Sequence, residues 1–355
     1  MKKLAFAILF LLVPFSSSYP ADPPTKLALL FAVPQSSCPE DFECGHGQGA
    51  FETFLLVIDG DQMKVAVRTP HLYVPRKSGF WEIGILPPKN LGGEQNGGDG
   101  SSNWYDWKLW AAPVGKKPEL PPFDNGNSDQ GGGHRRLTLS WVGNDYLSMT
   151  DYYETSSGSL NYVTAPMILS LDDLGNSGFS TFSSLKPWSP DFPPGIYKRE
   201  LGRCVSDGDP DGFHTREFLE SADQGWNVVR GRMRWEYEWT FNHGSGGARG
   251  FNSGCATTLR PPRSLVGADT LVLGWNHILP HVPDAQTAFS SPDGSLLLIF
   301  TKRQILAFHP AEGVLTKPFA TLPIESHPIL AAQWAVGKYA DNWAQILVQA
   351  KSWTE

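Results

Sequence analysis

The sequence predicts an all-β fold, and three observations support this prediction. Short apolar or alternating runs recur along the chain, turns rich in Gly, Pro, Asn and Asp separate them, and helical periodicity is almost absent. The 36 glycines and 29 prolines supply the turns that many short strands require. Strand after hairpin, with few helices, is typical of an all-β domain.

The first 18 residues have the three parts of a secretory signal peptide. Lys2 and Lys3 precede an apolar run over residues 4–15, and serines 16–18 supply the small residues of a cleavage site. The apolar run is too short to span the roughly 30 Å of membrane hydrocarbon. We therefore expect an exported protein, periplasmic or extracellular, without stable membrane insertion.

The chain is acidic, with 29 Lys and Arg against 36 Asp and Glu and a formal net charge of −7. Removal of residues 1–18 takes away Lys2 and Lys3 and makes the mature chain more negative. An acidic chain without a Lys/Arg block argues against nucleic acid or an anionic membrane as a partner. The expected partner is a protein or a glycan ligand of unknown identity.

Four cysteines in an exported chain favour two disulfides over metal ligation. Cys38 with Cys44 and Cys204 with Cys255 is the favoured pairing, because the first pair is local and the second flanks one segment. The other two pairings stay open. A zinc site would need C-x-x-C knuckles, which the sequence lacks.

Residues 19–50 are expected to form an N-terminal extension that carries Cys38 and Cys44, and residues 51–355 a single domain. Two stretches rich in Gly, Asn and Asp, near 92–103 and 124–133, cannot bury apolar surface and are expected as loop insertions. Neither stretch has the G-x-x-x-x-G-K-[ST] pattern of a phosphate-binding loop.

Hairpins and alternating strands fill the predicted domain. Asp59-Gly60 is a hairpin turn signal between two strands, and the longest alternating run, 233–241, places Trp235 and Trp239 on one face. The expected strands are 51–58, 62–67, 72–74, 80–85, 105–109, 136–142, 146–153 and 233–241.

Residues 284–310 give the clearest strand pattern, with two strands, a Ser-Ser-Pro-Asp-Gly turn and a third strand. This stretch resembles a blade of the β-propellers whose repeats carry an A-x-S-P-D-G-x-x-L core. The resemblance implies a β-propeller-like fold, and a two-layer β-sandwich is the alternative. The residues that carry it are Ala288, Ser291, Pro292, Asp293, Gly294 and Leu297.

Two helices are expected. One is a short segment, Thr215 to Ala222, and the other is an amphipathic C-terminal helix that packs onto the domain. The apolar spacing that predicts the second helix is formed by Tyr339, Trp343, Ile346, Leu347 and Ala350.

Residues 207–212, Asp-Gly-Asp-Pro-Asp-Gly, form the strongest chemical motif. Oxygens at positions 1, 3 and 5 with a glycine at position 6 are how a short loop wraps a calcium ion. Glu217 falls at position 11 instead of 12, so the loop departs from an EF-hand, and a solvated acidic turn is the alternative. The candidate ligands are Asp207, Asp209, Asp211, Thr215 and Glu217, and no cofactor other than calcium is expected.

The sequence contains no complete catalytic constellation. Glu236 and Glu238 share one strand face at a spacing that a glycosidase pair would allow, but Arg232 and Arg234 share that face, which favours a charge-paired surface. His277 and His281 have metal-ligand spacing, but Pro280 disfavours the helix that they would need.

Thirteen tryptophans raise the possibility of sugar stacking, but Trp107, Trp235 and Trp239 fall on the apolar phase of their strands and are assigned to the core. Trp81, Trp104 and Trp188 lie nearer turns. The recognisable features are a scaffold, disulfides and a calcium loop, which favours a non-enzymatic binding or protein-interaction module. The alternative is a secreted hydrolase that acts on glycans or related polymers through carboxylates in a central pocket.

Overall fold

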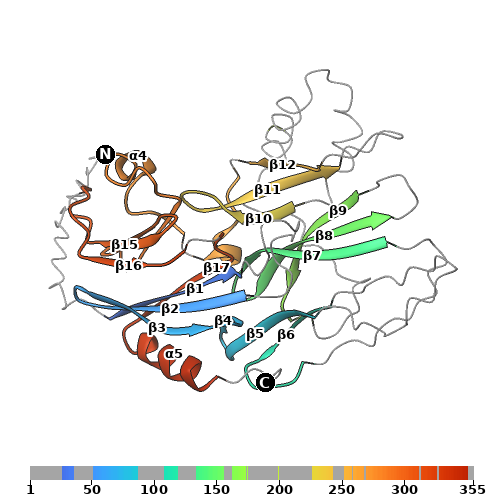
Figure 1. The fold of residues 1–355 in the computed structure, drawn as a ribbon, viewed down its shortest axis with the longest axis horizontal. Coiled ribbons are helices and arrows are strands. Elements are labelled where there is room, and N and C mark those ends of the chain that lie inside the picture. The colour runs from blue at the N-terminus through green and yellow to red at the C-terminus, as the bar shows by residue number, and fades with distance from the viewer. Residues whose placement is uncertain are drawn as a thin grey trace, which may run out of the picture.

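In the part of the chain that the computed structural model describes, seventeen strands form five antiparallel sheets, with few helices. Figure 1 shows the arrangement of these sheets. None of these sheets closes on itself, and the all-β prediction is confirmed. The structure describes residues 26–35, 51–86, 108–118, 133–155, 162–172, 174, 199, 226–242, 252–257, 259–267, 269–311, 313–325 and 328–350.

The sheets follow one another along the chain, and we number them I to V. The three helices described are α3 (Arg263–Val266), α4 (Trp275–Ile278) and α5 (Lys338–Gln349). Sheet I has the order β17 (Ala331–Val336), β1 (Leu27–Pro34), β2 (Phe51–Asp59), β3 (Gln62–Thr69). Sheet II contains β4 (Leu72–Arg76), β5 (Gly79–Leu86) and β6 (Lys108–Pro113), and sheet III contains β7 (Gly133–Val142), β8 (Tyr146–Thr155) and β9 (Tyr162–Ser170). Sheet IV contains β10 (Trp226–Arg230), β11 (Trp235–Asn242) and β12 (Asn252–Ala256), and sheet V contains β13 (Thr287–Ser290), β14 (Leu297–Phe300), β15 (Gln304–Phe308) and β16 (Ala320–Pro323).

Sheet I joins the two ends of the described chain. β17 pairs antiparallel with β1, with Leu27 opposite Val336 and Ala32 opposite Ala331. The amide of Leu330, just before β17, donates to the carbonyl of Ala32 at 2.8 Å, and its own carbonyl accepts from the amide of Val142 in sheet III at 2.7 Å. The last strand of the structure therefore completes sheet I, and the residue just before it bonds to sheet III.

Strand β1 lies within the stretch 19–50 that the sequence analysis treated as an extension. All eight of its residues are buried, because β2 and β17 flank it and side chains pack on both of its faces. A strand covered on both faces reads as a continuous apolar run instead of an alternating one. The sequence Leu-Ala-Leu-Leu-Phe-Ala-Val-Pro fits this description, and Phe31 stacks on Phe54 with ring centroids 5.0 Å apart.

Side-chain contacts link each sheet to the next. Between sheets I and II, the hydroxyl of Thr53 accepts from the amide of Tyr73 at 3.1 Å. Between sheets II and III, Arg76 donates to the carboxylates of Asp145 and Asp172 at 3.2 and 2.9 Å. Apolar side chains from both of these sheets also share one buried cluster.

The remaining boundaries are linked in the same way. Between sheets III and IV, Ser148 donates to Asn227 at 3.1 Å. Arg230 of sheet IV donates to the hydroxyl of Thr287 in sheet V at 2.9 Å. Sheet V returns to sheet I, because the Phe300 ring meets that of Phe31 edge-on at 5.3 Å.

The two turns predicted from glycine are present. The hairpin between β2 and β3 is closed by the pair Asp59 and Gln62, so the turn residues are Gly60 and Asp61, one position later than predicted. Gly60 has φ of 55° and Gly294 has φ of 74°, the left-handed region that glycine enters without strain. The hydroxyl of Ser291 donates to Asp293 at 2.5 Å.

The C-terminal helix is present as α5, next to β17 and β3 (Figure 1). Its packed face overlaps the predicted face at Trp343 and Leu347 but is rotated toward Ala340 and Ala344. Ala340 and Leu347 are buried, with Trp343 and Ala344 partly buried against the same cluster. Tyr339 and Ile346 were predicted to pack but are 59% and 42% exposed. Neither α5 nor any other helix in the described part of the chain has the length and apolarity required to cross a membrane.

Candidate functional site

A histidine and a buried carboxylate meet on sheet II. His71 immediately precedes β4, and Glu82 lies on β5 opposite Tyr73. Residues two apart on a strand, and residues directly opposite on neighbouring strands, share one sheet face. The Nδ1 atom of His71 lies 3.2 Å from Oε1 of Glu82, whose side chain is only 4% exposed. The turn between the two strands therefore brings an acid and a base together inside the protein.

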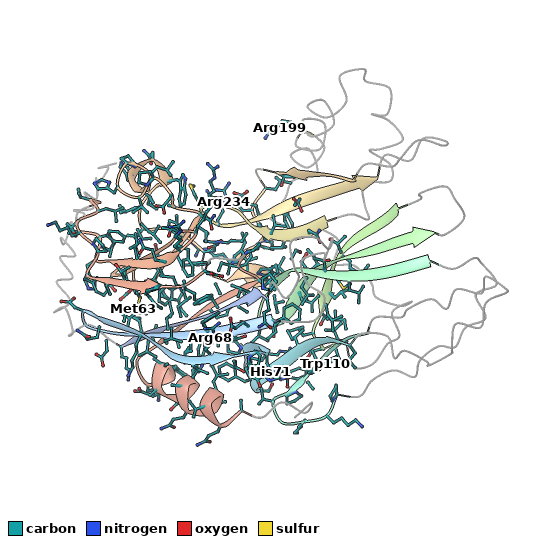
Figure 2. All side chains as sticks on the ribbon, viewed as in Figure 1. Met63, Arg68, His71, Trp110, Arg199 and Arg234 are labelled. Carbon is teal, nitrogen blue, oxygen red and sulfur yellow. The ribbon has the colours of Figure 1, made fainter. Side chains whose placement is uncertain are left out.

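The neighbouring tryptophan fits this face because Gly84 has no side chain. Gly84 lies opposite Trp110 on β6, and a Cβ atom at position 84 would lie 2.5 Å from the Trp110 ring. The indole therefore covers the backbone of Gly84. Figure 2 labels His71 and Trp110 among the side chains around this sheet.

A hydroxyl group on sheet I bonds to the backbone at His71 and Tyr73. The hydroxyl of Thr53 donates to the carbonyl of His71 at 2.6 Å and accepts from the amide of Tyr73 at 3.1 Å. The Tyr73 ring lies 5.7 Å from the imidazole. A carboxylate at Nδ1 favours the tautomer that carries a hydrogen there. The contact with Glu82 and the hydrogen bond from Thr53 therefore hold His71 in one position beside sheet II.

A second polar cluster lies between sheets III and IV. Besides its bond from Ser148, Asn227 donates to the hydroxyl of Thr150 at 2.7 Å, and the amide of Val228 donates to Ser148 at 2.8 Å. Asn227, Ser148 and Thr150 are all buried. Glu238 lies opposite Asn227 on β11, and burial raises the pKa of its carboxyl. This cluster joins two sheets through hydrogen bonds that do not depend on charge.

A buried ion pair joins sheets IV and V. Arg230 donates to Asp269 at 2.6 Å and to the carbonyl of Ala288 at 2.5 Å, and its guanidinium lies 4.0 Å from the centre of the Phe289 ring. Asp269 also accepts from the amide of Trp235. Burial raises the pKa of Asp269, and the positive charge of Arg230 opposes that shift. The guanidinium of Arg230 donates to a carboxylate, a hydroxyl and a carbonyl, so its role is to join sheets IV and V.

The predicted charge pairing on β11 is present for one of the two glutamates. The Nε atom of Arg234 lies 3.5 Å from Oε1 of Glu236, an ion pair in which this nitrogen makes no hydrogen bond. Arg232 is exposed. Trp235 is buried, as predicted for the apolar phase of this strand.

His277 and His281, the two histidines with metal-ligand spacing, do not lie on one helix. Helix α4 ends at Ile278, and Nδ1 of His281 lies 3.1 Å from the carbonyl oxygen of His277. Across the part of the chain that the structure describes, no three His, Cys, Asp or Glu side chains gather in a way that suits a metal ion.

Several predicted features lie outside the described residues. They are the signal peptide, the short helix at 215–222, the loop 92–103, most of 124–133, and the side chains of Trp104, Trp107, Trp188 and Trp239. The calcium ligands Asp207, Asp209, Asp211, Thr215 and Glu217 also lie there, as do Cys38, Cys44 and Cys204. Cys255 lies on β12 opposite Trp239, and its side chain is not described.

The sequence analysis missed the pair of His71 and Glu82, although a signal for it was present. Glu82 is the one charged residue in the run Phe-Trp-Glu-Ile-Gly-Ile-Leu, where it interrupts an apolar strand. A charge inside such a strand requires a partner. The hairpin register then points to β4 and to the residue that precedes it.

Comparison with known protein families and with curated protein sequences finds no match to this chain.

Proposed function

We propose that the chain is an exported, non-enzymatic binding or protein-interaction module on a β-propeller-like scaffold. Its ligand is a protein or a glycan, and calcium at the loop 207–212 stabilises it. In this proposal sheets I to V are the blades of a ring, and β17 closes the ring by completing the first blade.

The order of the sheet contacts carries the proposal. Sheet I meets II, II meets III, III meets IV, IV meets V, and V returns to I through Phe300 and Phe31. A two-layer sandwich would place sheets in two facing layers, whereas here a path of contacts runs from each sheet to the next and back to the first, with one further bond between the start of β17 and sheet III. Completion of the first sheet by the last strand fits the same cycle.

The use of the buried polar groups supports binding over catalysis. The hydroxyl of Thr53, the amide of Asn227 and the guanidinium of Arg230 each bond to a neighbouring sheet. Such groups make a rigid scaffold, and a ring of rigid sheets presents its connecting loops as a recognition surface.

Ring closure is tested by two truncations of the mature chain. A chain of residues 19–337 lacks α5 and keeps β17, whereas a chain of residues 19–329 lacks both. We expect cooperative urea unfolding of the first, measured by tryptophan fluorescence, and its loss in the second, because β1 then has an unpaired edge. An equal unfolding midpoint for both chains would show that closure by β17 is not needed, and the ring would be wrong.

Calcium binding is tested by thermal unfolding of residues 19–355 in chelator and in millimolar calcium. An ion that binds the folded state raises the midpoint. We expect a rise that Asp209→Ala removes and that Asp284→Ala, at an exposed turn, leaves in place. An unchanged midpoint in the unsubstituted protein would reduce residues 207–212 to a solvated acidic turn.

Ligand binding is tested with purified soluble glycans, by calorimetry together with chromatography of the recovered ligand. A binding module gives saturable heat and returns the glycan intact. Shortened products would favour the hydrolase, and neither heat nor products would direct the search to protein ligands.

One observation favours the secreted hydrolase as the second candidate. Burial raises the pKa of Glu238, and a raised carboxyl pKa is what a general acid requires. Hydrolysis of a glycan that Glu238→Gln abolishes and Glu236→Gln retains would establish that role. Equal activity of the two variants would exclude Glu238 as the acid.

A further inference from the structure

Exposed apolar side chains gather near the C-terminal end of the described chain. Six large apolar side chains are exposed among the residues that the structure describes, and four of them lie at the end of β17 and on α5. These four are Val336, Tyr339, Ile346 and Val348. An exposed apolar surface of this kind on a globular protein is typical of an interaction site.

Helix α5 has a wider apolar face than the domain buries. Ala340 and Leu347 are its buried residues. Tyr339, Trp343 and Ile346 follow one another at i, i+4 and i+7, so they form a row along one side of the helix, next to the buried face. Trp343 is partly buried against the domain, whereas Tyr339 and Ile346 are exposed. The row therefore extends the packed face of the helix into solvent.

The charges around this helix favour a second copy of the chain as the occupant of the row. The protein is acidic, with a formal net charge of −7, so two copies repel each other in most orientations. From Asn342 to Ala350 the sequence contains no charged residue, and Asp341 at the start of the helix is paired with Lys26. Two acidic copies can therefore meet at this surface without bringing like charges into contact.

The position of Lys338 gives this contact a direction. Lys338 is the first residue of α5, where a positive charge opposes the helix dipole, and the last turn of the helix has no basic residue. In an antiparallel pair of α5 helices, Lys338 of each copy lies beside the C-terminal turn of the other, where the dipole attracts a positive charge. A two-fold axis midway between positions 339 and 346 also sets Tyr339 of one copy against Ile346 of the other, and the reverse.

We propose that α5 is a self-association surface, on which a second copy of this chain packs its own α5 antiparallel across a two-fold axis. Figure 1 shows α5 at the edge of the fold, beside β3. The row of Tyr339, Trp343 and Ile346 forms the apolar centre of the contact, and Lys338 supplies the charge at each end. A contact of one helix per copy is small for a protein interface, and small interfaces associate transiently. The proposal goes beyond ligand binding and does not depend on it.

Analytical ultracentrifugation of residues 19–355 tests the surface. The weight-average mass is measured from about 1 to about 300 μM protein, a range that covers weak and transient pairs. We expect the mass to rise from the monomer value toward twice that value. Ile346→Lys places a charge in the apolar contact and should keep the mass at the monomer value throughout. Val272→Lys is the matched control, because Val272 lies before α4 and is 43% exposed against 42% for Ile346, and it should associate as the unsubstituted protein does.

Lys338→Glu separates the contact from the stability of the helix. A carboxylate in the first turn suits the dipole of its own helix, so thermal unfolding of the variant should occur at the same temperature or a higher one. In the pair this carboxylate would face the negative end of the other helix, so the dissociation constant should rise by about tenfold. An unchanged dissociation constant would contradict the antiparallel arrangement. A monomer at every concentration would overturn the proposal, as would association that Ile346→Lys leaves intact or that Val272→Lys removes equally.

Discussion

Ser148 and Asn227 form a buried hydrogen bond of 3.1 Å between sheet III and sheet IV. The same asparagine donates to Thr150 at 2.7 Å. One side chain therefore bonds to two hydroxyls on the neighbouring sheet.

We expect Asn227→Ala to lower the free energy of unfolding by about 2–3 kcal/mol, because it removes the buried acceptor of the Ser148 hydroxyl and the donor to Thr150. Asn342→Ala, on the exposed face of α5, should change it by no more than about 0.5 kcal/mol. Urea unfolding monitored by fluorescence measures both. A similar small effect for both variants would show that water replaces the Asn227 amide.

Glu238→Gln should stabilise the protein at neutral pH. Burial raises the pKa of this carboxyl, so the folded state favours its protonated form and the charged form costs stability. That cost is present above the folded pKa and fades as the pH falls toward the unfolded value. The stability advantage of Gln should therefore shrink on acidification, in unfolding experiments from pH 8 to pH 4. An advantage that is constant with pH would contradict a buried carboxylate.

Gly84→Ala should destabilise the protein by about 1–3 kcal/mol, the usual cost of overpacking a filled site. The added methyl would lie 2.5 Å from the Trp110 ring, while the backbone at position 84 needs no positive φ. Chemical unfolding with Trp110→Leu as the background provides the control. In that background the alanine should cost much less, and an undiminished cost would place the strain in the backbone.

Leu347→Ala should cost about 2–4 kcal/mol, because it removes buried methyl groups. Ile346→Ala, one residue earlier, should cost less than about 1 kcal/mol, since that side chain is 42% exposed against 4% for Leu347. Thermal unfolding of the two variants compares them directly. The reverse order would contradict the burial of Leu347 on the packed face of α5.

Local patterns predicted the hairpins of sheets I, II, III and V well. Alternation and turn residues depend on neighbours in sequence, so strands such as β2, β5 and β8 could be placed from the chain alone. Strand β1 was missed because its continuous apolar run has no alternation, and its partner β17 is remote in sequence. No local signal encodes that pairing.

The site could be predicted less well than the fold. His71 and Glu82 meet through a hairpin register, and a sequence search for short motifs does not follow registers. The face of α5 was predicted only in part: Trp343, Leu347 and Ala350 pack on the domain as expected, whereas Tyr339 and Ile346 are exposed. An apolar spacing of Tyr339, Ile346 and Leu347 fits a helical stripe, but the cluster that α5 covers admits Ala340 and Leu347 and leaves Tyr339 in solvent.

The pairing of Leu27 with Val336 also bears on how the protein is made. β1 is among the first strands to leave the ribosome, and its outer edge has no partner until β17 has been synthesised. Contacts so distant in sequence form slowly. An apolar edge that waits this long is a target for aggregation, so we expect a holding chaperone to occupy it.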